Sequence, residues 1–188
     1  MNLPPLPPLP PLAIRILVEI LVIIAAIWDI RTRRIPNWLT FPGVLLGVGV
    51  NTFLFEFSGL KFSLIGLGLA LGVYLVLYLL HAMGAGDVKL MAAVGAAVGP
   101  ASWFVILLLT AIAGAVAGLI LVAFKGRLHR TFANVGIILT SLGRGRAPYK
   151  ESPELDVNTD QGMRLPHGAL IAIATLGFLV AELRWAPR

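Results

Sequence analysis

The chain has 188 residues, of which 58% are hydrophobic and 13% charged, and its formal net charge is +6. The apolar runs are too long and too many for a soluble domain of this size, so the composition indicates a polytopic membrane protein. The chain has no cysteine, which excludes disulfides, thiolate zinc sites and a cysteine nucleophile. Its three histidines are scattered, and we expect neither a metal nor a cofactor.

The predicted fold is all-α, a polytopic membrane bundle of six transmembrane helices. Residues 1–12 repeat the pattern Leu-Pro-Pro and predict an extended polyproline II arm outside the cytoplasm. Residues 13–188 form the transmembrane domain, with a cytoplasmic loop at about 125–164. The six helices are expected at residues 13–28, 37–57, 62–83, 88–99, 102–124 and 165–183. A turn is expected at residues 58–61, an interruption at Pro100, and Asn37 as the cap of the second helix.

Small residues at fourfold spacing predict that the helices approach one another closely. The pairs are Gly43 with Gly47, Gly68 with Gly72, Gly95 with Gly99, and Gly114 with Gly118. We expect all of them to serve helix packing, and a homodimer through these glycine faces is left open.

The basic residues predict the orientation, because lysine and arginine collect in cytoplasmic loops. Most of the 15 basic residues lie in residues 31–34, at Lys89 and in residues 125–164. With six crossings these stretches share the cytoplasmic face, and both termini lie outside. The positive charge is thus interpreted as a topology signal, so the expected partner is the lipid bilayer and no nucleic acid is expected.

One acid stands out in the stretch Gly84-Ala85-Gly86-Asp87-Val88-Lys89-Leu90, between two long apolar segments. A charged side chain near the bilayer is costly, about 2.5 kcal/mol or more at the centre of a helix, which makes Asp87 a functional candidate. Alternatively, Asp87 could be the N-cap of the following helix, and Gly84 the C-cap of the helix before. A second acid, Asp29, closes the first apolar segment, and the predicted topology places both acids on the cytoplasmic face.

Two carboxyl groups at hydrogen-bonding distance in a partly dry site share a proton and titrate as a unit. One can act as general base on a water molecule while the other, protonated, polarises a carbonyl and later protonates the leaving nitrogen. Gly84 and Gly86 suit this chemistry, because glycine allows positive φ and leaves no Cβ in the way of an extended substrate backbone. The pattern therefore predicts aspartic peptidase chemistry without a metal.

These residues resemble a known family. Asp29 with Arg33-Arg34-Ile35-Pro36-Asn37, together with the Gly-x-Gly-Asp stretch followed by Lys89-Leu90, is similar to the type IV prepilin peptidases, which are membrane aspartic peptidases. Residues 165–172 also look like the start of the family's last helix, so the resemblance covers nearly the whole chain. A departure is His167, where the family leads us to expect an aromatic residue after the proline.

The resemblance implies a prepilin leader peptidase in the inner membrane of a bacterium or archaeon, with Asp29 and Asp87 as its catalytic pair. Gly84, Gly86 and Lys89 are implied as motif residues that support substrate binding. The implied substrates are pilin precursors, cut at the cytoplasmic face between a basic leader and the hydrophobic pilin helix. The chain looks like the short, peptidase-only type of Flp/Tad pilus systems, and we expect no N-methyltransferase activity.

Several other residues each allow two interpretations. His81 and Lys89 could influence the titration of Asp87 or only mark the membrane border, and His167 could relay protons or only pack at a helix start. Apolar residues at helical spacing from 132 to 142 predict a helix in the cytoplasmic interface. The acidic cluster within residues 151–160 could attract a basic leader or be a solvated loop.

Two competing functions use the same acids. A proton-coupled carrier would use Asp29 and Asp87 as relay sites, but it needs polar residues at mid-depth, which we do not expect in the second, third and fifth helices. A non-catalytic assembly factor of a pilus or secretion apparatus would use Asp87 only as a cap. It would tolerate Asp87→Asn, since asparagine caps about as well as aspartate.

Overall fold

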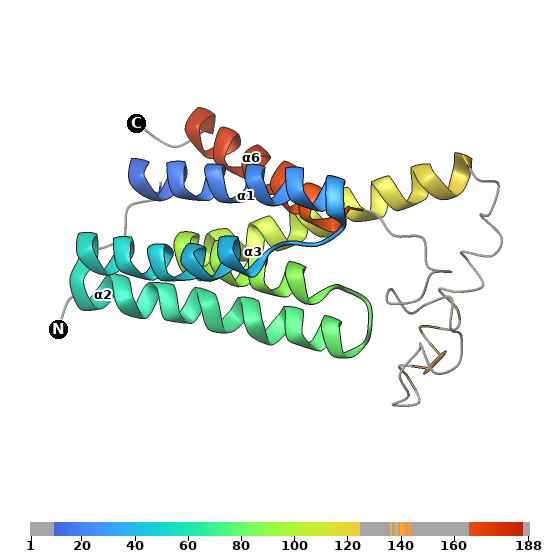
Figure 1. Ribbon diagram of the computed structural model, residues 1–188, viewed down its shortest axis with the longest axis horizontal. Helices are drawn as coiled ribbons and strands as arrows, with labels where there is room; N and C mark the ends of the chain where they lie inside the picture. Colours follow the sequence, from blue (N-terminus) through green and yellow to red (C-terminus); the bar gives the residue numbers. More distant parts are fainter. Residues whose placement is uncertain are drawn as a thin grey trace.

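The computed structural model describes residues 10–124 and 166–185, together with residues 136, 138, 140, 141 and 143 between them. Its helices are α1 (Leu12–Thr32), α2 (Asn37–Leu79), α3 (Ala85–Phe124) and α6 (His167–Trp185). No strand occurs in this part of the chain, so the all-α prediction is confirmed for it. In Figure 1, α1 lies beside α6, and α2 and α3 lie together on the other side of the bundle.

Four predictions concern residues outside this description. They are the first nine residues of the polyproline arm, most of the cytoplasmic loop, the apolar side chains expected to form an interface helix, and the acidic cluster within residues 151–160. These four stay predictions.

Helices α2 and α3 each contain one residue with non-helical backbone angles, which divides the helix into two arms. In α2 this residue is Glu56 (φ 53°, ψ −135°), and in α3 it is Gly99 (φ 76°, ψ 178°), followed by Pro100. Figure 1 shows that the chain folds back at both breaks, so the two arms of each helix lie side by side. The interruption expected at Pro100 is thus confirmed.

The turn predicted at residues 58–61 is wrong, because these residues are helical and the chain reverses at Glu56 instead. Glu56 is exposed, and its positive φ is unusual for a residue that carries a Cβ. The hydroxyl of Ser58 donates a hydrogen bond to the carbonyl oxygen of Phe55 at 2.5 Å. This bond satisfies a carbonyl at the end of the first arm, where the helical partner is lost.

Three helices are long and apolar enough to cross a membrane: α2 with 43 residues, α3 with 40, and α6 over His167–Arg184. At 1.5 Å per residue the two arms of α2, like those of α3, add up to about 60 Å of helix, roughly twice the thickness of a bilayer core. Their breaks would let each of them cross twice. α1 is not among the three, because Arg15, Glu19 and Asp29 interrupt its apolar sequence. Six crossings and external termini therefore stay predictions.

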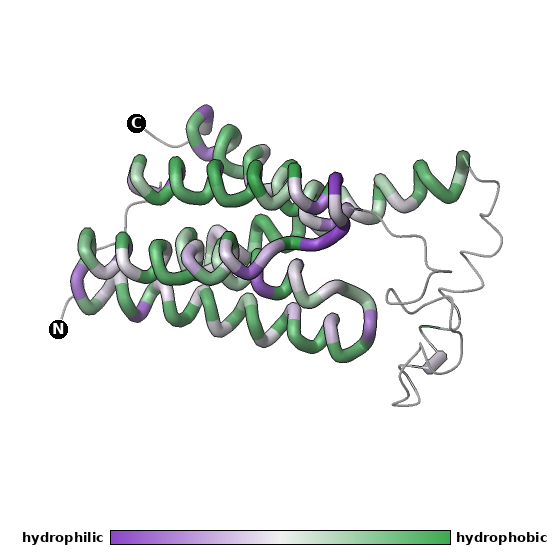
Figure 2. Tube along the Cα trace, in the orientation of Figure 1, coloured by the Kyte–Doolittle hydropathy of each residue, from purple (hydrophilic) through white to green (hydrophobic). Residues whose placement is uncertain are grey.

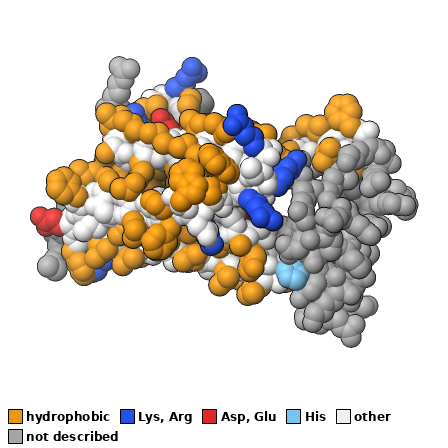
Figure 3. Space-filling view, viewed as in Figure 1, with side chains coloured by type: hydrophobic (Ala, Val, Ile, Leu, Met, Phe, Trp, Pro, Cys, Tyr) orange, Lys and Arg blue, Asp and Glu red, His pale blue; other side chains and the backbone are white. Residues whose placement is uncertain are grey.

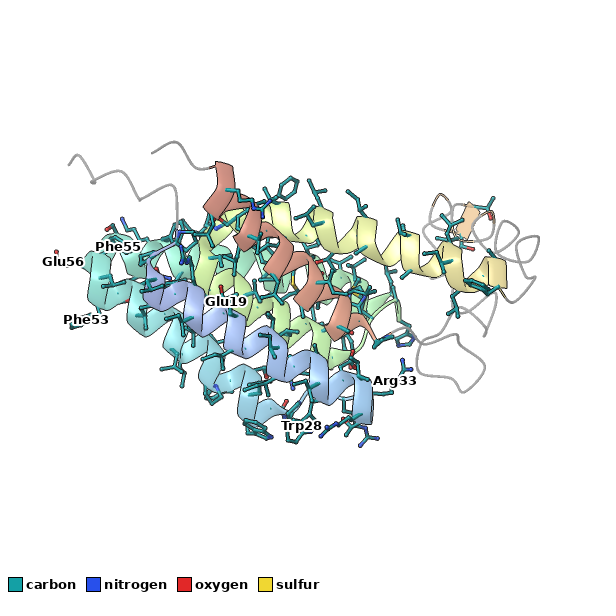
Figure 4. All side chains as sticks on the ribbon, turned by 90° about the horizontal axis from the view of Figure 1, so that it is seen from above. Glu19, Trp28, Arg33, Phe53, Phe55 and Glu56 are labelled. Atoms are coloured by element: carbon teal, nitrogen blue, oxygen red, sulfur yellow. The ribbon has the colours of Figure 1, made fainter. Side chains whose placement is uncertain are left out.

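The surface of the bundle is largely apolar, as lipid contact requires. Phe41 and Phe53 are 68% and 86% exposed, and many aliphatic side chains are about half exposed. In Figure 2 the hydrophilic residues gather at the connection between α1 and α2 and at the opposite end of the bundle, where α2 breaks. Figure 4 likewise shows Trp28 and Arg33 at one end and Phe53, Phe55 and Glu56 at the other.

The first arm of α3 forms the centre of the bundle. Every residue from 90 to 99 is buried, and most of them are alanine, glycine or valine. Small side chains let α2 and α6, which both pack on α3, approach its backbone closely. Asp87 is therefore held at the start of the most deeply buried helix.

Glycine packing is confirmed where α2 meets this arm. A Cβ on Gly95 would lie 2.5 Å from the carbonyl oxygen of Gly66, and a Cβ on Gly47 would lie 3.0 Å from the backbone nitrogen of Ala97. Gly43 lies against Leu21 of α1, where a Cβ would come within 2.9 Å of the leucine side chain. Gly47 and Gly95 thus allow close contacts between helix backbones, and Gly43 leaves room for the Leu21 side chain.

For three other glycines the packing prediction is wrong within the described residues. A Cβ on Gly68, Gly72 or Gly118 would have no atom within 4 Å, and one on Gly114 would only touch Leu170 at 3.8 Å. Gly66, which the fourfold pairs did not include, takes the packing role in the second arm of α2. A homodimer through the outward-facing glycines stays a prediction.

Asn51 joins the arms of α2 to α3 near both breaks. Its Nδ2 atom donates hydrogen bonds to the hydroxyl of Ser63 at 2.9 Å and to the carbonyl oxygens of Ala96 and Ala97 at 3.2 and 2.9 Å. The carbonyl of Ala96 would normally bond to the N–H four residues on, but that residue is Pro100, which has none. Asn51 therefore supplies the donor that the break in α3 removes.

The expectation that the fifth helix lacks polar residues at mid-depth needs a correction, because Thr110 is buried near its middle. Asn51 and Ser63 are also buried, but they lie close to the break at Glu56. Thr110 bonds to its own helix, donating to the carbonyl of Ile106 at 2.7 Å, so it is satisfied locally.

Candidate active site

Asp29 lies in the last turn of α1 and is only 7% exposed. Its Oδ2 atom accepts a hydrogen bond from the backbone N–H of Gly168 at 2.8 Å. Gly168 is the second residue of α6, and the first backbone N–H groups of a helix have no partner within it. The carboxylate of Asp29 therefore accepts a hydrogen bond from a backbone donor that α6 itself cannot satisfy. The helix dipole also favours a negative charge at this end of α6.

Asp29 directly follows the apolar stretch that ends at Trp28. Its surroundings act on the pKa of its carboxyl group in opposite directions. Burial raises the pKa of its carboxyl group, and this is the largest effect. The hydrogen bond from Gly168 and the positive charge of Arg33 act to lower the pKa. The net pKa is higher than that of an ordinary aspartate, so Asp29 holds a proton more readily.

Asp87 lies in the first turn of α3, and its Oδ2 atom accepts a hydrogen bond from the N–H of Gly84 at 3.2 Å. This corrects the capping alternative. Gly84 comes directly before α3 and does not close α2, whose cap is Leu80. Asp87 is the third residue of the helix and reaches back to the residue before it, as the acid of a capping box does. Asp87 therefore has a structural role at the start of α3, and this role is compatible with a role in catalysis.

The structure brings the two predicted acids together. Ile35 lies against Gly168, which bonds to Asp29, and also against Gly86, which directly precedes Asp87. Each is held by a backbone N–H at the start of a helix, Asp29 by α6 and Asp87 by the residue before α3. The pair lies at the end of the bundle where α1 finishes and α3 begins. Its catalytic role stays a prediction, which we take up below.

Ile35 connects the surroundings of both acids. A Cβ on Gly86 would lie 3.1 Å from Cβ of Ile35, and a Cβ on Gly168 would lie 3.0 Å from its Cδ1. The side chain of Ile35, which is 8% exposed, is thus packed between the Gly-x-Gly-Asp stretch and the start of α6. The short connection after Asp29 therefore helps to fix the position of α3 relative to α6.

The motif glycines do not use the positive φ that glycine allows, since among the described glycines only Gly99 has one. Their expected role in leaving space for a substrate backbone stays a prediction. Gly86 leaves room for Ile35, whereas a Cβ on Gly84 would make an ordinary contact of 3.4 Å with Oδ2 of Asp87. Glycine at 86 is required by packing within the protein.

Lys89 is exposed, and its Nζ atom donates a hydrogen bond to Oδ1 of Asn37 at 2.8 Å. The prediction that Asn37 caps the second helix is wrong, because Pro36 holds the cap position and no side chain bonds there. Lys89 and Asn37 instead join the start of α3 to the start of α2. The described contacts thus give Lys89 a role in holding the two helix starts together.

Sequence reasoning missed three residues of this site: Gly168, Ile35 and Tyr74. The match of residues 165–172 to the family's last helix contained a signal for Gly168, but not its contact with Asp29. Tyr74 is fully buried in α2, and its ring packs edge to face on Trp103. His167 is half-buried, and its Nε2 atom has no hydrogen-bond partner in the described part of the chain. His81 lies in the turn between α2 and α3 with a φ of 56°.

Within residues 10–124 and 166–185, no group of three or more histidine, aspartate or glutamate side chains could hold a metal ion.

The profile of the type IV leader peptidase family, Peptidase_A24, matches residues 16–119. The chain belongs to this family. The matched range contains both Asp29 and Asp87, and it ends within α3, before α6 begins. No curated protein and no solved structure matches the chain. Membership of the type IV leader peptidases confirms the family that the residues resemble and makes the chain a peptidase, which is a hydrolase.

Proposed function

We propose that this chain is an intramembrane aspartic endopeptidase that removes the basic leader peptide of type IV pilin precursors, with Flp-type precursors as the expected substrates. The observation that carries the proposal is that Asp29 and Asp87 lie at the same end of the bundle, around the packing site of Ile35, in a member of the leader peptidase family. Two coupled carboxyl groups from different helices are the arrangement that aspartic peptidase chemistry needs.

In the proposed reaction the pair shares one proton. The ionised carboxyl group removes a proton from a water molecule, whose oxygen then forms a bond to the carbonyl carbon of the scissile peptide. The protonated carboxyl group polarises the carbonyl oxygen. Collapse of the tetrahedral intermediate breaks the carbon–nitrogen bond, and a carboxyl group delivers a proton to the leaving nitrogen. The products are the free leader and a pilin with a new amino terminus, which we expect to stay unmethylated.

The hydrogen bonds of the two acids support this assignment. The bonds from Gly84 and Gly168 both go to Oδ2 atoms, so a backbone donor orients each carboxyl group. Backbone donors on helix starts are rigid, and rigid support is what a preorganised catalytic pair requires.

We assign the site to the cytoplasmic face because of the charges around it. Arg31, Arg33 and Arg34 follow Asp29 and are exposed, and Figure 3 shows basic side chains gathered over this part of the molecule. Trp28 and Trp38 at the same end pack edge to face with ring centroids 5.4 Å apart, and both are exposed. Tryptophan prefers the membrane interface, and arginine its cytoplasmic side.

The test is co-expression with a Flp-type precursor, with leader removal measured by mass for the wild type and for Asp29→Asn and Asp87→Asn. Asparagine keeps an oxygen that can accept the N–H of Gly168 or Gly84, so both variants should fold. We expect cleavage by the wild type and none by either variant. Cleavage that survives one substitution would make that acid a cap only. A wild type without activity on any pilin precursor would favour the non-catalytic assembly factor.

A further inference from the structure

Tyr74 is a buried polar residue that the proposed reaction does not yet use. It lies in the second arm of α2 with an exposed fraction of 0%, and its hydroxyl has no hydrogen-bond partner among the described residues. Nearly all buried hydroxyls in proteins are hydrogen-bonded, so each exception requires an explanation. A buried donor with no permanent partner is suited to a partner that arrives during the reaction.

The position of the ring is fixed by Trp103 of the second arm of α3. The two rings pack edge to face, with centroids 6.4 Å apart and planes inclined at 68°. Trp103 is 1% exposed, and its Nε1 atom likewise lacks a partner in the described part of the chain. The hydroxyl of Tyr74 is therefore held in place by packing and not by a hydrogen bond.

The register of the helices places Tyr74 near Asp87. Ala70 packs on Gly95, whose Cβ would lie 3.0 Å from that of the alanine, and the arms run in opposite directions. Tyr74, one turn after Ala70, therefore comes level with Met91, one turn before Gly95. Asp87 lies one further turn before Met91, or about 6 Å along the helix axis.

We propose that Tyr74 is a positioning residue, whose hydroxyl donates a hydrogen bond to the Asp87 carboxyl group when substrate is bound. The inference rests on the proposed peptidase function. Catalytic hydrogen bonds are often formed only in the complex with substrate. This accounts for a Tyr74 hydroxyl that lies near Asp87 but has no hydrogen bond to it in the absence of substrate. The bond would hold Asp87 in the orientation that the shared proton requires.

The test compares Tyr74→Phe with Tyr78→Phe in the full-length protein. Tyr78 lies one turn further along the same arm, level with Asp87 in this register, but it is 37% exposed, so its substitution removes the same hydroxyl from a side chain that is not buried. Leader removal is measured at several concentrations of a Flp-type precursor, with thermal unfolding of each variant and Asp87→Asn as the inactive reference. Phenylalanine keeps the ring that packs on Trp103.

We expect Tyr74→Phe to lower kcat by about 10-fold to 100-fold, the range of a hydrogen bond to a charged group, with KM and the unfolding temperature unchanged. Tyr78→Phe should leave both kinetic constants unchanged. Unchanged kcat in Tyr74→Phe, or a loss of activity that accompanies a lower unfolding temperature, overturns the role of Tyr74. A rise in KM alone would also overturn it. Cleavage by Asp87→Asn, or none by the wild type, overturns the proposed function instead.

Discussion

The backbone N–H of Gly168 donates a hydrogen bond to Oδ2 of Asp29 at 2.8 Å, although 139 residues separate them in the sequence. The bond fixes the end of α1 to the start of α6. Gly168 also lies against both Asp29 and Ile35, since a Cβ there would meet both side chains. The position of one acid of the pair thus depends on a helix far along the chain.

Gly168→Ala should therefore lower cleavage. The new methyl group would lie 3.1 Å from Oδ2 of Asp29 and 3.0 Å from Cδ1 of Ile35, both closer than ordinary contact. We expect Asp29 to be displaced and kcat/KM to fall by about tenfold or more, because catalytic groups tolerate little misplacement. The measurement is the initial rate of leader removal.

Gly177→Ala is the matched control for this variant. It makes the same change in the same helix, at a position where a Cβ has no atom within 4 Å. Its kcat/KM should stay within about twofold of the wild type. Equal loss in both variants would mean that α6 tolerates no alanine, and the contact with Asp29 would not be the cause.

The rate of cleavage should pass through a maximum as the pH changes. The pair must hold one proton, so activity falls when both carboxyl groups are protonated and when both are ionised. Because burial raises the pKa of Asp29, the proton is kept to a higher pH than in an exposed aspartate, whose pKa is about 3.9. The alkaline decline should begin well above pH 4 in a profile of kcat/KM. A rate that rises steadily with pH would contradict the shared proton.

Gly99→Ala should destabilise the protein. Gly99 has φ 76° and ψ 178°, a conformation that only glycine adopts readily, and a Cβ there would overlap the ring of Phe62. We expect a loss of about 2 kcal/mol or more in the free energy of unfolding. Gly118→Ala in the same helix meets no atom within 4 Å and should cause no loss. Thermal unfolding in detergent compares the two, and equal midpoints would show that the break does not need glycine.

Asn51→Ala should also lower stability, because it leaves the carbonyls of Ala96 and Ala97 without their donor at the break. The expected loss in the free energy of unfolding is about 2 kcal/mol, in the range for buried polar groups that lose their partner. Thr52→Ala is the neighbouring control, since the hydroxyl of Thr52 bonds only to Val48 in its own helix. If both variants unfold at the same temperature, the carbonyls find other donors.

The sequence predicted the approximate location of the two acids correctly. Charge distribution and helix lengths placed Asp29 and Asp87 at the same end of the bundle, because the two helices between them return the chain to that end. The contact between Asp29 and Gly168 could not be predicted in this way. The predicted topology shows which helix ends lie on the same face of the membrane. It does not show which helices are neighbours on that face.

The fourfold glycine spacing likewise could not predict which glycines lie at a helix contact. Gly66, Gly68 and Gly72 lie in one arm that is apolar on all sides, so the sequence contains no polar face from which the buried side could be inferred. Only Gly66 faces α3. The break at Gly99 was predictable because Pro100 cannot continue a helix, whereas the break at Glu56 has no such residue and was misplaced by a few positions.

The bond between Asp29 and Gly168 also sets a minimum length for an active fragment. A chain cut after Phe124 would retain both acids and all of the residues that match the family profile. It would lack the donor that orients Asp29 and the surface against which Ile35 packs. We expect such a fragment to show no leader removal, and activity to return when α6 is supplied as a separate peptide inserted in the same membrane.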